Sequence, residues 1–115
     1  MPFDGVEISE VTERLVIGRA RIEAGWCQGH LYLNRWSWYG RSREYCLIGA
    51  VRVDLPGWSI GGPDAAADLL TLAIIKLGYG TGIWPVSAFN DSPVRTKAQV
   101  LDVVDLAIAM SRGDR

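Results

Sequence analysis

The sequence predicts a mainly α-helical fold of the α+β class, with about four helices and one small two-stranded β-hairpin near residues 30–45. Several stretches repeat their apolar residues at the spacing of an α-helix, and one stretch between them alternates as a β-strand does. The 115 residues contain no internal repeat, linker or low-complexity segment, and they suffice for one hydrophobic core. We therefore expect a single domain over residues 1–115.

The first predicted helix runs from about Ser9 to Ala24. Ser9 is a suitable N-cap, and Gly25 stands where a left-handed residue commonly ends a helix. Gly18 lies within the apolar stripe, where it costs about 1 kcal/mol relative to Ala, so we expect another backbone to approach it closely. The stripe consists of Ile8, Val11, Leu15, Gly18 and Ile22.

A β-hairpin is predicted next. An extended strand beginning at His30 would place aromatic side chains on one side, and Gly40–Arg43 would form the turn. A second strand, or the start of a helix, begins near Glu44. We favour a helix from Tyr45 to about Val53, although residues 51–53 are equally compatible with a strand. The aligned strand residues are Tyr32, Asn34, Trp36 and Trp38, and the apolar seam of the helix is Cys46, Gly49, Ala50 and Val53.

Two further helices complete the predicted fold. After a loop at 55–62, Pro63 suits the first position of a helix that is apolar nearly all round and is therefore expected to be central; it ends at Gly78. Thr96 and Gln99 match a capping box at the start of the last helix. The buried positions expected in that helix are Val100, Val103, Val104, Ala107 and Ile108.

Four short motifs occur in a fixed order: Gly25-Trp-Cys-Gln-Gly29, Cys46-Leu-Ile-Gly-Ala50, Phe89-Asn-Asp91 and Arg95-Thr96. With this order and spacing, the chain resembles a family of small, uncharacterised bacterial and phage proteins known only as a domain of unknown function. The resemblance covers roughly residues 15–109. It departs from the family pattern at Phe89, where Trp is usual, and in the Trp/Tyr-rich insert over 31–45. The resemblance implies a compact, mostly helical fold and no particular activity.

Five residues have the chemistry of a thiol-dependent hydrolase or transferase: Cys27 or Cys46 as nucleophile, His30 as base, and Asn90 and Asp91 as orienting groups. The simpler interpretation, which we favour, is that both cysteines are small buried hydrophobes. Asn90 and Asp91 would then stabilise a loop before the last helix through turn hydrogen bonds.

Other classes of site find little support in the composition. Two Cys and one His do not complete a zinc site, so no metal is expected, and no cofactor is implied. The glycines at 78–82 follow a helix and lack the residues of a phosphate-binding loop. A net charge of −1 argues against a duplex-DNA binder. The absence of a signal-like segment or an apolar span favours a cytoplasmic protein without a membrane anchor.

The insert combines aromatic rings with guanidinium groups, and four Arg against one Glu between residues 31 and 52 give it a local charge of +3. Such residues occur in single-strand nucleic-acid platforms and in protein interfaces, although they could equally pack across a hairpin that covers the core. We expect a non-catalytic, intracellular binding or assembly module that forms a homodimer through this hairpin. Another protein partner or a small ligand is the next expectation, and nucleic acid is the least expected partner. The alternative is the small thiol-dependent enzyme. The candidate binding residues are Tyr32, Arg35, Trp36, Trp38, Arg41 and Arg43.

Overall fold

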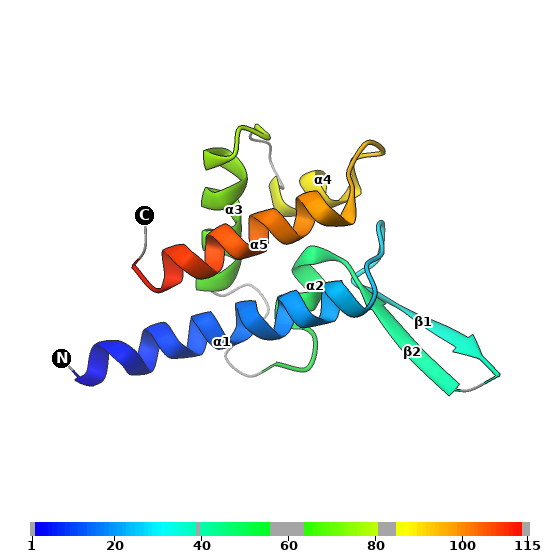
Figure 1. Ribbon diagram of the computed structural model, residues 1–115, viewed down its shortest axis with the longest axis horizontal. Helices are drawn as coiled ribbons and strands as arrows, with labels where there is room; N and C mark the ends of the chain where they lie inside the picture. Colours follow the sequence, from blue (N-terminus) through cyan, green and yellow to red (C-terminus); the bar gives the residue numbers. More distant parts are fainter. Residues whose placement is uncertain (1, 39, 56–63, 81–84, 114–115) are drawn as a thin grey trace.

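A computed structural model describes residues 2–38, 40–55, 64–80 and 85–113. Within them, one helix precedes an antiparallel hairpin and the other helices follow it, in the predicted order, which confirms the mainly helical α+β class (Figure 1). The structure contains one helix more than expected in its described part. The elements are α1 (Pro2–Ala24), β1 (Tyr32–Ser37), β2 (Gly40–Tyr45), α2 (Leu47–Arg52), α3 (Ala65–Lys76), α4 (Pro85–Asp91) and α5 (Lys97–Ser111).

Helix α1 is longer than predicted, and Ser9 lies inside it rather than at its cap. The close approach of a backbone at Gly18 is confirmed, because a Cβ there would stand 3.4 Å from the carbonyl group of Ala50 in the crossing helix α2. It would also stand 2.6 Å from Cγ1 of Val51. The left-handed ending predicted at Gly25 is wrong. The Gly25 carbonyl instead accepts a hydrogen bond from the amide of Tyr45 (2.9 Å), and the chain leaves the helix in an extended form beside β2.

The hairpin is confirmed, but its turn is not where the sequence indicated. Gly40–Arg43 belong to β2, and Ser37 pairs with Gly40. Gly40 is the residue that predicts the turn, but in the structure it begins the second strand, with a φ of +133°. As a result, each arginine of β2 faces a residue of β1: Arg41 pairs with Trp36, and Arg43 with Asn34.

The stretch at residues 45–53 divides into strand and helix. Tyr45 ends β2, Cys46 is the N-cap of α2, and the buried seam is completed by Val51 rather than the predicted Val53. Gly49 packs directly on the chain before β1: a Cβ at this position would lie 2.0 Å from the carbonyl oxygen of Leu31. Only glycine fits this contact between helix and hairpin.

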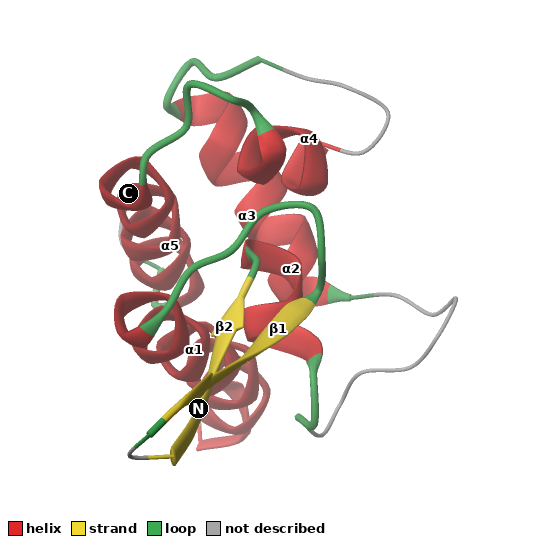
Figure 2. Ribbon diagram, turned by 90° about the vertical axis from the view of Figure 1, so that its right-hand side faces the viewer, coloured by secondary structure: helices red, strands yellow, loops and turns green. Residues whose placement is uncertain are grey.

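Helix α3 begins after its N-cap Asp64, whose side chain accepts from the amide of Ala67. The predicted first position, Pro63, lies outside the described residues. Helix α3 packs on all four other helices, as expected of a central helix. It is not buried all round, however, because Leu72 and Ile75 are exposed. The two longest helices, α1 and α5, run alongside each other (Figures 1 and 2).

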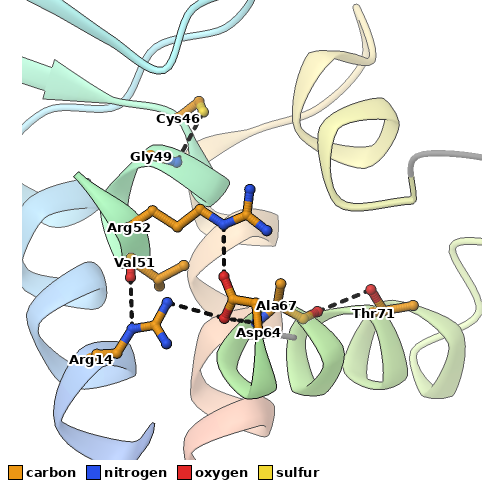
Figure 3. Close-up of polar contacts among 8 residues, drawn as sticks. All are labelled: Arg14, Cys46, Gly49, Val51, Arg52, Asp64, Ala67 and Thr71. Carbon is orange, nitrogen blue, oxygen red and sulfur yellow. Dashed lines mark hydrogen bonds and ion pairs between the residues drawn. The ribbon is translucent and has the colours of Figure 1, made fainter. Parts of the chain in front are cut away.

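Asp64 also joins three helices. Its carboxylate accepts from Nη2 of Arg14 in α1 (3.0 Å) and from Nε of Arg52 in α2 (2.7 Å), as Figure 3 shows. Arg14 in turn donates through Nε to the carbonyl of Val51 (3.0 Å). Arg14 and Asp64 are both buried, so this ion pair is part of the interior.

Of the predictions for α4 and α5, one is wrong and the others are confirmed. Residues Asn90 and Asp91, predicted in a loop, end the short helix α4. The capping box of Thr96 and Gln99 at the start of α5 is present as predicted. The five predicted core positions of α5 (Val100, Val103, Val104, Ala107 and Ile108) are all buried.

Candidate functional site

Four of the five candidate catalytic residues meet at one small pocket of about 190 Å³, formed where α4 faces the N-terminus of α2 and the chain before β1. They come from segments far apart in the sequence. Its lining includes His30, Leu31, Cys46, Ser87, Asn90 and Asp91. Cys27 is not among the lining residues.

The side chain of Asn90 is the centre of this region and is only 1% exposed. Its Oδ1 accepts from Nε1 of Trp26 (2.7 Å) and from the amide of Leu47 (3.0 Å). Its Nδ2 donates to the carbonyl of Cys27 (3.1 Å) and to Oδ1 of Asp91 (2.9 Å). An amide offers two donors and an oxygen that commonly accepts two bonds, so Asn90 has no capacity left for a ligand.

The neighbours of Asn90 extend the same network. Asp91 Oδ1 also accepts from the amide of Gly29 (2.9 Å), and Nε2 of Gln28 donates to the carbonyls of Asn90 (2.9 Å) and Ser92 (2.8 Å). The turn hydrogen bonds expected within residues 90–93 are therefore replaced by bonds to residues 27–29, more than sixty positions earlier. We call Trp26–Gly29, Cys46, Leu47 and Asn90–Ser92 the Asn90 junction.

Arg95 closes the junction from the side of α5. Its Nε donates to the carbonyl of Phe89 (2.8 Å), and its guanidinium stands 3.9 Å from the centre of the Phe89 ring and 4.6 Å from that of Tyr79. All four sequence motifs thus contribute to one packed region.

Neither cysteine is prepared to act as a nucleophile. Sγ of Cys27 donates to the carbonyl of His30 (3.6 Å), so this bond does not involve the imidazole. Burial, with a smaller contribution from Cys46, raises the pKa of Cys27 to about 11. Burial also raises the pKa of Cys46, although hydrogen bonds from backbone amides oppose the shift. Both thiols therefore stay protonated near neutral pH, and a nucleophilic cysteine needs the thiolate.

The candidate binding residues lie on the hairpin, which projects from the helices (Figure 1). Trp36 is 77% and Trp38 93% exposed, so the tip of the hairpin does not cover the core. Arg41 stands 5.5 Å from the centre of the Trp36 ring, and Arg43 4.4 Å from that of Tyr32. Tyr32, Trp36, Arg41 and Arg43 share one face with Asn34 and Tyr45. Trp38, predicted on the same face of the strand, lies instead in the turn after β1, which ends at Ser37.

Arg35 is the exception among the candidates. It lies on the opposite face of the hairpin and donates to Glu44 (3.0 Å).

Sequence reasoning missed two members of the site. Trp26 and Gln28 received no role, although both belong to the Gly25–Gly29 motif. The order of the motifs was the only available signal, because nothing local to Trp26 points to a partner in α4.

Comparison with known proteins gives one finding. The model of a family described as a family of unknown function, DUF6197, matches residues 9–110, which confirms the resemblance to an uncharacterised family. No curated protein and no solved structure matches the chain. Within the described residues, no group of three or more His, Cys, Asp or Glu could hold a metal ion, and no helix is both long and apolar enough to cross a membrane.

Proposed function

We propose, for a chain that belongs to the DUF6197 family, a function that follows from its own surface. The protein is a non-catalytic binding and assembly module, and its β1–β2 hairpin binds the hairpin of a second copy.

The observation that carries this proposal is the exposure of Trp36 and Trp38 on a projecting hairpin. A large aromatic side chain can bury about 150–250 Å², and the apolar patch on a typical monomer is only about 300–600 Å². Removing apolar surface from water contributes about 25 cal/mol per Å². Two tryptophans and Tyr32 together therefore supply the apolar centre of an interface.

A second copy of the chain fits this surface better than a nucleic acid does. Two-fold homodimers are the commonest assembly of soluble chains. The net charge of the chain is −1, and two of the three hairpin arginines, Arg35 and Arg43, form ion pairs with Glu44 and Asp54, so most of the positive charge of the hairpin is compensated. The enzymatic alternative has less support, because the thiols are protonated and Asn90 has no free hydrogen-bonding group.

The experiment is light scattering at tens of micromolar on the wild type and on Trp36→Ser/Trp38→Ser. We expect a dimer for the wild type and a monomer for the double variant. Val94→Ser is the matched control, because Val94 is 78% exposed but lies in the turn before α5, and it should remain dimeric. Circular dichroism checks that all variants are folded.

Two outcomes would overturn the proposal: a wild type that is monomeric at every concentration, or a folded double variant that still dimerises. Salt-sensitive binding of a short single-stranded oligonucleotide by a monomeric wild type would point to nucleic acid instead.

A further inference from the structure

We infer that the second copy binds along the outer edge of β1, so that the two hairpins form one continuous four-stranded antiparallel sheet with its two-fold axis at Asn34. This inference rests on the proposed function, and it specifies the partner surface and the register.

The backbone of the hairpin shows which groups point outward. Tyr45 donates through its amide to the carbonyl of Gly25 (2.9 Å), and its carbonyl accepts from the amide of Cys27 (3.1 Å), so these groups face away from β1. In an antiparallel ladder, inward and outward pairs alternate. Tyr45 pairs with Tyr32, so Asn34 and Trp36, two and four positions further on in β1, also direct their amides and carbonyls outward.

The two edges of the hairpin differ. The edge of β2 is occupied at Tyr45 by the segment at Trp26, and its remaining outward positions are Arg41 and Arg43. Charged residues at an edge oppose pairing with another strand. The outward positions of β1 are uncharged (Tyr32, Asn34 and Trp36), and in the described part of the chain β1 pairs with β2 alone. The edge of β1 is therefore the one open to a further strand.

Four two-fold registers pair at least three residues of β1, and charge and length select one. An axis at Arg35 would place two guanidinium groups opposite each other, and like charges in that position are destabilising. An axis at Leu33 or at Trp36 would pair only three residues of the strand. An axis at Asn34 pairs residues 32–36 and places each Arg35 opposite the partner's Leu33.

The register at Asn34 also explains the exposed tryptophan. It places Trp36 opposite the partner's Tyr32, twice over by symmetry and on one face of the sheet. Residues in such hydrogen-bonded pairs have Cα atoms about 5.5 Å apart, and aromatic side chains paired across strands in this way stabilise a sheet.

The decisive variant is Asn34→Pro. Because the amide of Asn34 points outward, proline leaves the internal ladder of the hairpin intact and removes one hydrogen bond from each side of the axis. The preceding Leu33 is already extended, as a residue before proline prefers. We expect Asn34→Pro to be monomeric by light scattering. Asn34→Thr is the control, since it changes the side chain but keeps the amide, and it should remain dimeric.

A second measurement decides the case if the proline variant fails to fold. Under mild oxidation, Asn34→Cys should form a covalent dimer across the axis, because a Cα separation of about 5.5 Å suits a disulfide. Ser42→Cys lies on β2 and on the other face of the hairpin, so it should form no such dimer.

The outcomes distinguish this inference from the proposed function. A dimeric, folded Asn34→Pro beside a monomeric Trp36→Ser/Trp38→Ser would overturn edge pairing and leave the hairpin as the interface. Equal cross-linking of the two cysteine variants would also overturn it. A monomeric wild type would overturn both.

Discussion

The Asn90 junction and the hairpin use the same kinds of residue in opposite ways. Trp26 in the junction donates its indole N–H to Asn90 at 2.7 Å and packs on the core, whereas Trp36 in the hairpin is 77% exposed. Arg95 stacks on Phe89 and donates to its carbonyl, whereas Arg41 has only the ring of Trp36 as a described contact.

This difference separates the residues that build the fold from those that remain available to a partner. Residues of three of the four sequence motifs form the junction, Arg95 of the fourth packs beside it, and hydrogen bonds within the fold use the whole side-chain amide of Asn90. The hairpin lies between two of these motifs in the sequence, and its side chains at Trp36 and Trp38 are exposed. A motif in a sequence can thus mark residues whose side chains hold the fold together.

The largest expected effect is that of Asn90→Ala. The change leaves Trp26 Nε1, the amide of Leu47 and the carbonyl of Cys27 without their partner, and each buried unsatisfied group costs about 1–3 kcal/mol. We expect a loss of about 4 kcal/mol in the free energy of unfolding, measured by urea titration. Ser87→Ala, an exposed change in the same pocket, is the control. A loss below about 1 kcal/mol would show that the junction is not a structural centre.

Asp64→Asn should follow, at about 3 kcal/mol, because it leaves the buried Arg14 without a counter-charge. Burial opposes ionisation of Asp64, but hydrogen bonds from Arg52 and Ala67 and the charge of Arg14 lower its pKa overall. The carboxylate therefore stabilises the fold above its unfolded pKa, and this contribution disappears as the pH falls through the lower folded value.

Acid unfolding tests the same carboxylate directly. Stability measured against pH should fall less steeply below about pH 4 in Asp64→Asn than in the wild type. Identical acid slopes would show that Asp64 is not the titrating group.

Thr96→Ala should lower the free energy of unfolding by about 1 kcal/mol, because it removes the hydroxyl that accepts from the amide of Gln99 in the capping box of α5. Thr96→Ser keeps the hydroxyl and should restore most of the stability in the same urea titration. A change within about 0.3 kcal/mol would place the effective start of the helix elsewhere.

The smallest expected effect is that of replacing an arginine of the hairpin, and it is compared with the same replacement beside the junction. Arg41→Ser should change the unfolding free energy of the monomer by about 0.5 kcal/mol or less, because its cation–π contact is exposed. Arg95→Ser should cost about 2 kcal/mol, because a hydrogen bond to Phe89 is lost with the stacking. Equal effects of the two variants, compared at a concentration where the chain is monomeric, would contradict the division into two regions.

The features that the sequence predicted correctly have local signals. The cap of α5 depends on two residues three positions apart, and Gly18 is marked by its place in an apolar stripe. The features that it missed depend on distant partners. Asn90 bonds residues 43 and 63 positions away, and no pattern within α4 encodes them. The helix α4 itself has seven residues, too few for a clear period.

Arg21 fixes the base of the hairpin to the helices. Its Nη1 donates to the carbonyls of Ala50 (3.2 Å) and Val53 (2.7 Å), and its guanidinium stacks 4.5 Å from the ring centre of Tyr45. With the contact between Gly49 and Leu31, this clamps the base of the hairpin to both α1 and α2. The hairpin is therefore held at its base and projects at its tip, and its strand β1 is about 17 Å long at 3.4 Å per residue. In the proposed dimer, the two hairpins joined along β1 would form a rigid connection that sets the distance and the relative rotation between the helices of the two copies. A flexible linker of equal length could not do this.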